Sequence, residues 1–318
     1  MITNDDCTNC KRAAIKLGYW QDPYIDLFSR GTPHIERKTP EINRGYFARV
    51  AAIKIIIEKF LASVKGQGKQ CQIVNLGCGF DTLYWRLMDN NDGGDTDRNV
   101  DSSLIKHFVD VDLYGITSRK IFHIRHRPKL LSSLGDDIQF NPMELQSNVY
   151  KLIPVDLRDT NSLSTKLLTE CHLDKELPTL FIAECVLIYM TVEHSNNLIA
   201  WISANFTQPA FINYEQINIF DRFGQIMVDN LRQRDVELLD LDSCKDLESQ
   251  KSRFICNGWD NVEAWDMYHV YRFGIPPNEL HRIENIEFLD EANLLEQLLT
   301  HYCLVVAKKN LPNFKVEF

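Results

Sequence analysis

The stretch from Cys71 to Thr82 constrains the fold of this chain more than any other. The apolar residues Ile73, Val74 and Leu76 predict a buried strand. Gly77 and Gly79 follow directly, and they permit a tight turn with no side chain in the way. Residues 82–87 then resume with helical spacing. A strand, a glycine turn and a helix form the first unit of an open α/β sheet, which binds ligands beyond the carboxyl ends of its strands.

Further apolar segments alternate with helical patterns after this unit. The predicted strands cover residues 107–113, 150–159, 179–187 and 210–215. Such alternation predicts an α/β fold with a mainly parallel sheet. A last apolar run at 302–307 is predicted to pair antiparallel inside that sheet.

Composition argues against several classes of function. The net charge is -9 and no long Lys/Arg cluster occurs, so nucleic acid is not expected as a partner. We find no signal peptide and no apolar run that could span a bilayer, so no membrane partner is expected. The nine cysteines are an odd, scattered set, which suits reduced thiols and a cytoplasmic location.

A single CxxC motif, Cys7 and Cys10, lies near the N-terminus. A tetrahedral zinc site would need a second Cys or His pair nearby, and none is present in the sequence around it. We therefore expect no metal site. The two thiols are expected on a loose, polar segment formed by residues 1–10.

Glycine turns of this kind serve dinucleotides, flavins and S-adenosylmethionine. The dinucleotide fingerprint requires a third glycine three positions after the second, and Thr82 stands there. The spacing therefore favours S-adenosylmethionine over NAD. A purely structural tight turn is the alternative for Gly77 and Gly79.

Acidic residues at the ends of the predicted strands would extend a cofactor site. Asp112 ends the second strand, and its carboxylate could accept both ribose hydroxyl hydrogens. Asp110 competes for this role because it lies two residues earlier on the same face. Asp156 ends the third strand and could reach the adenine amino group, with Leu157 packed on the ring. The alternative for Asp156 is a helix cap.

Glu184 ends the fourth strand, which is otherwise apolar. A buried carboxylate without a partner is costly, so Glu184 should face a partner or an open pocket. The methionine ammonium of the cofactor would suit, and an internal salt bridge is the alternative. Arg49 begins an apolar helix and could pair with a carboxylate through two parallel hydrogen bonds, or it could be solvated.

Several longer strings resemble the leucine carboxyl methyltransferase family. They are Glu41–Arg49, Ile73–Gly77, Phe181–Leu187, Phe211–Gln216, Asp221–Met227 and Glu284–Glu296. The resemblance covers nearly the whole chain from Lys11 to Lys308 and is weakest at 89–105 and 125–150. It implies a class I S-adenosylmethionine-dependent methyltransferase fold, with a Rossmann-like sheet, an N-terminal helical cap and inserted helices.

The resemblance implies methyl transfer from S-adenosylmethionine to the C-terminal leucine carboxylate of the protein phosphatase 2A catalytic subunit. That carboxylate is already ionised near pH 7, so no general base is required and no catalytic residue is assigned. The implied cofactor contacts are Lys11, Arg49, Gly77, Asp112, Asp156, Leu157 and Glu184. Arg49 would serve the cofactor's carboxylate. Arg44 and Tyr189 are our own candidates for the substrate side.

Other functions stay open at this point. A methyltransferase-like protein could hold the phosphatase without turnover, and a carboxyl methyltransferase could act on another substrate, either a small molecule or a tRNA-linked carboxylate. We expect one methyltransferase domain over residues 1–318. Its expected parts are a helical cap at 1–70, a cofactor-binding core at 71–215, and a helical insertion with C-terminal strands at 216–318.

Overall fold

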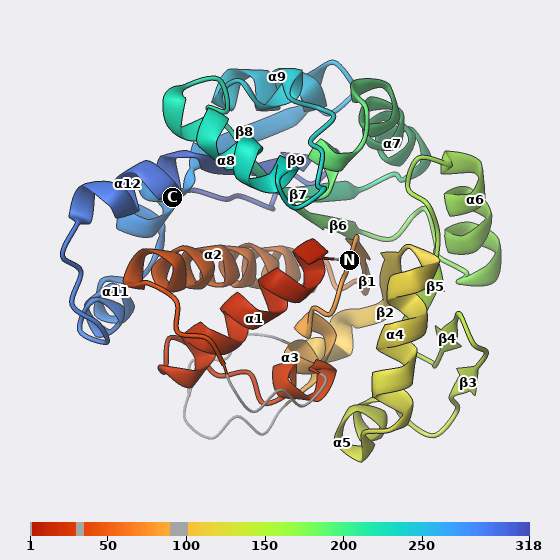
Figure 1. Ribbon diagram of the computed structural model, residues 1–318. Helices are drawn as coiled ribbons and strands as arrows, with labels where there is room; N and C mark the ends of the chain where they lie inside the picture. The colour runs from red at the N-terminus through yellow and green to blue at the C-terminus, as the bar shows by residue number, and fades with distance from the viewer. Residues whose placement is uncertain (1, 30–34, 90–100) are drawn as a thin grey trace.

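A nine-stranded mixed sheet with helices on both faces forms the centre of the molecule (Figure 1). The structure is a computed structural model, and it describes residues 2–29, 35–89 and 101–318. The strands in chain order are β1 Cys71–Leu76, β2 Ile105–Asp112, β3 Gln139–Phe140, β4 Leu145–Gln146, β5 Tyr150–Pro154, β6 Thr179–Glu184, β7 Pro209–Gln216, β8 Asn261–Asp266 and β9 Tyr302–Lys308.

The spatial order of the strands is β3-β4-β5-β2-β1-β6-β7-β9-β8. The five strands from β5 to β7 are parallel. The last strand of the chain, β9, lies antiparallel between β7 and β8. The predicted parallel core and the antiparallel C-terminal strand are therefore confirmed. Because β1 lies between β2 and β6, the glycine turn after it stands at the middle of the sheet's carboxyl edge.

Twelve α-helices occur among the described residues, and they surround this sheet. They are α1 Ile2–Lys16, α2 Pro40–Lys65, α3 Leu83–Met88, α4 Tyr114–Arg125, α5 Pro128–Leu131, α6 Thr160–Ser164, α7 Val192–Asn205, α8 Arg222–Arg232, α9 Leu247–Ile255, α10 Met267–His269, α11 Pro277–Glu284 and α12 Ala292–Thr300. No helix that the structure describes is long and apolar enough to cross a membrane.

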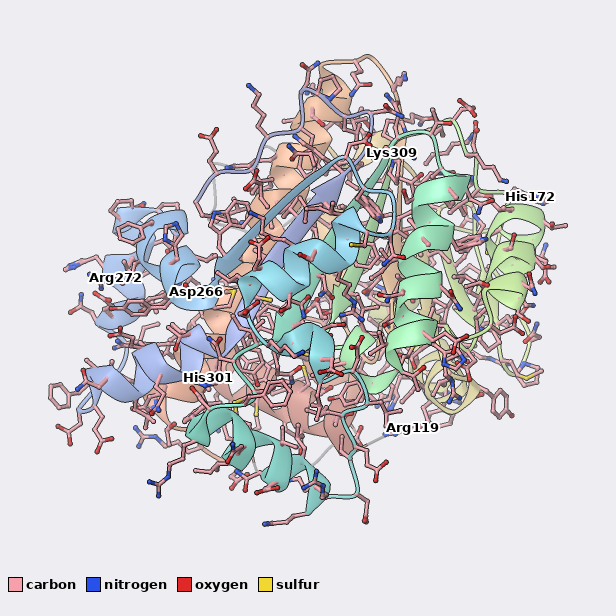
Figure 2. The ribbon with its side chains drawn as sticks, turned by 90° about the horizontal axis from the view of Figure 1, so that it is seen from above. Arg119, His172, Asp266, Arg272, His301 and Lys309 are labelled. Carbon is pink, nitrogen blue, oxygen red and sulfur yellow. The ribbon has the colours of Figure 1, made fainter. Side chains whose placement is uncertain are left out.

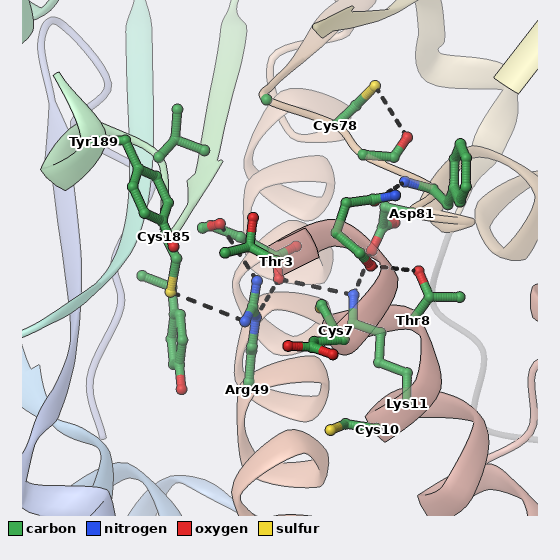
Figure 3. Close-up of a pocket in the computed structure, with 18 of the residues that line it drawn as sticks. Thr3, Cys7, Thr8, Cys10, Lys11, Arg49, Cys78, Asp81, Cys185 and Tyr189 are labelled. Carbon is green, nitrogen blue, oxygen red and sulfur yellow. Dashed lines mark hydrogen bonds and ion pairs between the residues drawn. The ribbon is translucent and has the colours of Figure 1, made fainter. Parts of the chain in front are cut away.

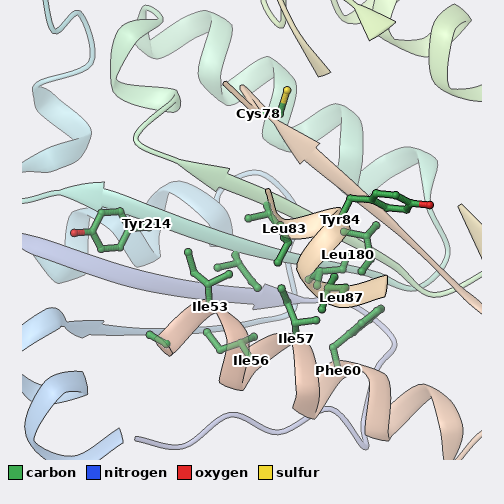
Figure 4. Close-up of a cluster of buried hydrophobic side chains, with 14 of the residues drawn as sticks. Ile53, Ile56, Ile57, Phe60, Cys78, Leu83, Tyr84, Leu87, Leu180 and Tyr214 are labelled. Atoms are coloured by element: carbon green, nitrogen blue, oxygen red, sulfur yellow. The ribbon is translucent and has the colours of Figure 1, made fainter. Parts of the chain in front are cut away.

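The two faces of the sheet bury separate apolar clusters. Side chains of a strand alternate between faces, so Ile73 joins the cluster under α2 while Val74 joins the cluster under α7 and α9. Figure 4 shows Ile53, Ile56 and Ile57 of α2 packed together on one side. The apolar stripe of α2 fixes this helix along the sheet, which places its N-terminal half near the carboxyl edge.

Two expectations about the chain outside the core were wrong. Residues 2–10 belong to helix α1 and are not loose. The sequence also predicts a loop over residues 125–150, but this segment contains α5, a 3-10 turn and the hairpin of β3 and β4. The sequence further predicts a polar surface loop at 89–101 and a loop at 30–44. Residues 90–100 of the first and residues 30–34 of the second lie outside the described residues.

Candidate functional site

A cavity of about 1300 Å³ opens at the carboxyl edge of the parallel strands. Its floor includes the glycine turn after β1 and the ends of β2 and β6. Helix α1 covers one side, and α8 and α12 contribute to the other. All seven expected cofactor residues border it, and Tyr189 does too.

The glycine turn leaves no room for side chains. Gly77 has φ +64° and Gly79 has φ +49°, a region that residues other than glycine rarely adopt. A Cβ atom on Gly77 would lie 2.6 Å from a methyl group of Val186, and one on Gly79 would lie 2.4 Å from Oδ1 of Asn4. The backbone can therefore approach a ligand closely at this turn.

Asp112 holds this turn in place. The Gly79 N–H donates to Asp112 Oδ2 at 2.7 Å, and the Leu113 N–H donates to Oδ1 at 2.7 Å. Burial raises the pKa of Asp112. Both oxygens retain free lone pairs, and the residue borders the cavity, so it can still accept hydroxyl hydrogens from a sugar.

Asp110, the competing acid, is enclosed in the protein. Its carboxylate accepts hydrogen bonds from Lys120 Nζ at 2.7 Å, from the Tyr150 hydroxyl at 2.7 Å and from Asn75 Nδ2 at 3.1 Å. The Asp110 side chain is 2% exposed and does not border the cavity formed by the described residues. The structure thus separates two acids that the sequence could not: Asp112 faces the ligand space, and Asp110 anchors helix α4 through Lys120.

Asp156 and Leu157 border the cavity beyond the end of β5. The Asp156 carboxylate pairs with Arg158, with Nε to Oδ1 at 2.9 Å and Nη2 to Oδ2 at 2.5 Å, and the hydrogen bonds from Arg158 lower the pKa of Asp156. The cap of α6 is Asp159, which accepts from the backbone N–H groups of Asn161 and Ser162. The alternative role of Asp156 as a helix cap is therefore wrong.

Four charged side chains from distant parts of the chain meet in the cavity wall (Figure 3). Arg49 Nε lies 2.5 Å from Glu184 Oε2, and Lys11 Nζ lies 2.6 Å from Asp81 Oδ2 and 4.0 Å from Glu184 Oε2. All four side chains are between 10% and 12% exposed. We call these four residues the charge network.

Burial disfavours the charged form of each residue in this network, and the oppositely charged partners favour it again. Burial alone would lower the pKa of Lys11 and of Arg49, but Asp81 and Glu184 raise the pKa of Lys11, and Glu184 raises the pKa of Arg49. Burial would raise the pKa of Asp81, but Lys11 and Arg86 lower it. The internal salt bridge considered for Glu184 is thus present. A zwitterion fits this donor set, because its carboxylate could share Arg49 and its ammonium could share Glu184.

Sequence reasoning missed Asp81 and the contribution of α1 beyond Lys11. Asn4 of α1 accepts a hydrogen bond from the Phe80 N–H at 2.8 Å. Asp6 of α1 pairs with Arg234 just beyond α8, with Nη1 to Oδ2 at 2.8 Å. The helical recurrence of Cys7, Lys11 and Ala14 was a signal for this helix.

Tyr189 lies in a 3-10 turn, residues 187–189, directly after β6. The turn is tied to β7, because the Ile188 N–H donates to Glu215 Oε2 at 3.1 Å. Burial raises the pKa of Glu215 to about 7 and also raises the pKa of Tyr189. Tyr189 therefore stays a neutral phenol at the cavity wall near pH 7.

Arg44 does not accompany the other site residues. Its Nη2 donates to the backbone oxygens of Glu284 at 3.2 Å and Glu287 at 2.9 Å. It is 4% exposed and is absent from the cavity wall that the described residues form. Arg44 therefore has a structural role: it joins α2 to the end of α11 and the segment after it. The geometry does not support our proposal that Arg44 contacts the substrate.

The sequence favours ordinary core packing for Phe220, Phe223 and Met227, and helix α8 departs from this prediction. Phe220, just before it, is 52% exposed, and Met227 borders the cavity. The ring of Phe223 packs against that of His301 at an interplanar angle of 49°. His301 Nε2 lies 2.9 Å from Asp221 at the start of the helix. Figure 2 shows His301 close to this helix.

The described residues contain no group of three His, Cys, Asp or Glu side chains placed to hold a metal ion.

Comparison with known proteins identifies the family. The model of the leucine carboxyl methyltransferase family matches residues 2–203. This chain belongs to that family. Leucine carboxyl methyltransferase 1 of Rattus norvegicus is 44% identical over 96% of this chain and 89% of its own length. Human tRNA wybutosine-synthesizing protein 4 is 33% identical, and the match covers 96% of this chain but 43% of that protein.

Membership in the leucine carboxyl methyltransferase family confirms an S-adenosylmethionine-dependent methyltransferase and its cofactor. The fold is similar to the crystal structure of a protein from Thermobifida fusca suggested to be a methyltransferase, with a TM-score of 0.54 and 13% identity over 85% of this chain and 83% of that one. The class I Rossmann-like architecture is therefore confirmed as well.

Proposed function

We propose that this protein transfers the methyl group of S-adenosylmethionine to the α-carboxylate of the C-terminal leucine of the protein phosphatase 2A catalytic subunit. The products are a methyl ester and S-adenosylhomocysteine. The observation that carries this proposal is the charge network of Lys11, Arg49, Asp81 and Glu184 in the wall of the cavity, in a chain 44% identical to a leucine carboxyl methyltransferase.

The size of the cavity supports a substrate larger than a cofactor alone. Its volume of about 1300 Å³ exceeds the roughly 300–1,000 Å³ of ordinary small-molecule sites. Asp112, Asp156 and Leu157 border the end near β2 and β5, whereas Tyr189, Met227 and the residues of α12 border the other end. We assign the first end to the nucleoside and the second to the peptide terminus.

The residues of the cavity would act by binding and orientation. S-adenosylmethionine supplies an electrophilic methyl group on a sulfonium. The attacking carboxylate is ionised near pH 7, so the protein needs no residue that removes a proton. Aligning a carboxylate oxygen with the methyl group can lower the barrier by roughly 7–11 kcal/mol in ideal cases.

Helices α1 and α8 would exclude water from this reaction. They stand on two sides of the cavity and are joined by the ion pair of Asp6 and Arg234. The sulfonium and the carboxylate lose their charges together, so a dry site favours the transition state over the separated ions. We propose the mouth between these helices as the entrance for the phosphatase tail, in the cytoplasm.

A non-catalytic binding protein is the less supported alternative. Such a protein would have no use for the cofactor residues, yet all seven border one cavity. A tRNA-linked carboxylate is the other alternative, and this chain spans less than half of human tRNA wybutosine-synthesizing protein 4.

The test is transfer of a radiolabelled methyl group to purified phosphatase catalytic subunit. We expect base-labile label on the intact subunit and none on a subunit that lacks its terminal leucine. Arg49→Met should abolish transfer, because it removes one cation of the charge network. Lys54→Met is the matched control, since Lys54 is a half-exposed cation on the same helix. Equal labelling of both phosphatase forms would refute the proposed specificity.

A further inference from the structure

Two thiols lie on the face of α1 that borders the cofactor cavity. Cys7 and Cys10 are three positions apart on this helix, so their side chains are neighbours on one surface. Both are partly buried and both border the cavity. In Figure 3 they stand on α1 close to Lys11 and Arg49. The sequence expectation of thiols on a loose segment was therefore wrong.

The surroundings of these thiols are those of the cofactor site. A negative charge on Cys7 would raise the pKa values of Lys11 and Arg49, which places its sulfur within electrostatic reach of both cations. Cys10 lies against Tyr46 and precedes Lys11 directly. A covalent change at either sulfur would thus alter the surroundings of the charge network. Methyl transfer to a carboxylate requires neither thiol.

We propose that Cys7 and Cys10 form a reversible disulfide that lowers the affinity of the cavity for S-adenosylmethionine. Residues three apart on a helix have Cβ atoms about 5–6 Å apart, whereas a disulfide holds its Cβ atoms about 3.8 Å apart. Helix α1 must therefore deform when the bond forms. Because Lys11 follows Cys10, the deformation moves it relative to Asp81 and Glu184, its partners at 2.6 Å and 4.0 Å.

Glutathione disulfide can supply the oxidation. The Cys7 thiolate attacks one glutathione sulfur, forms a mixed disulfide and releases one glutathione thiolate. The Cys10 thiolate then attacks the Cys7 sulfur, forms the intramolecular bond and releases the second glutathione. The two thiols lose two protons and two electrons in total, and one glutathione disulfide becomes two glutathiones. Burial raises the pKa of Cys10, so the second step should accelerate with pH.

This site differs from the other cysteines of the chain. Cys78 and Cys185 also border the cavity, but neither lies on α1. Cys71, Cys171, Cys244 and Cys303 are buried and do not border the cavity that the described residues form, and Cys256 is exposed just after α9. Cys256 therefore offers a matched control, because it is accessible to oxidant but far from α1 in the fold. Cytosolic disulfides, where they occur, are mostly transient or redox-sensing, which suits a bond that glutathione can reverse.

The test uses the full chain, reduced and then incubated with glutathione disulfide, and blocked with an alkylating reagent. Mass spectrometry of peptides should show a Cys7–Cys10 bond. Calorimetry should show S-adenosylmethionine affinity reduced at least about tenfold, or 1.4 kcal/mol, and restored by dithiothreitol. Cys10→Ser should carry a mixed glutathione disulfide on Cys7 instead. Cys256→Ser should respond to oxidant as the unmodified sequence does.

Three outcomes would overturn the proposal. They are glutathione adducts on both thiols without a bond between them, a bond from either thiol to Cys185, and a Cys7–Cys10 bond that leaves cofactor affinity unchanged. Cys7→Ala serves as a second variant if Cys10→Ser does not fold, and its cofactor affinity should not respond to oxidant. A reduced protein that does not bind S-adenosylmethionine would refute the cofactor site itself, so the two failures are distinguishable.

Discussion

Replacing Gly77 by alanine tests the geometry on which the cofactor site depends. Gly77 has φ +64°, and an added Cβ would meet Val186 Cγ2 at 2.6 Å and Cγ1 at 3.1 Å. Both residues border the cavity. The substitution therefore imposes two separate costs, one on the backbone and one on packing.

Each cost has a characteristic size. A left-handed backbone conformation costs a residue with a Cβ roughly 1–2 kcal/mol. Inserting a methyl group into a filled space costs typically about 1–3 kcal/mol. We therefore expect Gly77→Ala to lower the free energy of unfolding by roughly 2–5 kcal/mol. Alternatively, the turn shifts to relieve the contact, and S-adenosylmethionine affinity then falls in place of stability.

Urea unfolding and calorimetry with the cofactor measure these two quantities. Combining Gly77→Ala with Val186→Ala removes the packing cost alone, so the double variant should recover roughly 1–3 kcal/mol relative to additivity. Gly115→Ala is the matched control, because its added Cβ would meet nothing within 4 Å and its φ is ordinary. Equal stability and affinity for Gly77→Ala and Gly115→Ala would refute the reasoning.

Three further predictions concern other parts of the site and the core. Asp112→Ala should weaken S-adenosylmethionine binding sharply in calorimetry, because the ribose acceptor and the support of the glycine turn are lost together; unchanged affinity would remove this assignment. Arg44→Met should lower the urea midpoint of unfolding, because each buried carbonyl left unpaired costs about 1–3 kcal/mol. The KM for phosphatase should not change. A raised KM with normal stability would show that Arg44 contacts the substrate after all. Burial, together with Lys151, lowers the pKa of His107 to about 4 from 6.5. Between these pH values the unfolded chain therefore binds more protons than the folded one, and the free energy of unfolding should fall as pH drops from 6.5 to 4. His107→Gln should flatten this pH dependence in acid unfolding, and an unchanged slope would contradict the prediction.

The residues that gather in the cavity wall could be predicted because their signals are local. An acid at the end of an apolar strand must face the carboxyl edge of a parallel sheet, so Asp112, Asp156 and Glu184 converge once the strands are recognised. Arg44 and Arg49 show the limit of such signals. They are five positions apart on α2, which turns them about 140° from each other around the helix axis. Residue type alone could not tell which guanidinium faces the cavity.

What helix α1 contributes to the site beyond Lys11 could not be predicted, because the support of this helix is distant in sequence. Its first turns are polar, and short polar helices are marginal without tertiary contacts. Those contacts come from the glycine turn, where Asn4 binds the Phe80 N–H and Lys11 binds Asp81. The partners of each pair are about seventy positions apart, so no local pattern signals either contact.

The place of β9 between β7 and β8 governs the order in which this molecule can assemble on the ribosome. Residues 302–308 are synthesised after both neighbours. Until they emerge, β8 has nothing to join, and β7, buried along its whole length in the finished protein, presents an edge of unpaired backbone N–H and C=O groups. Domains generally fold as units during synthesis, and unpaired strand edges promote aggregation. A nascent chain arrested before residue 302 should therefore depend on chaperones.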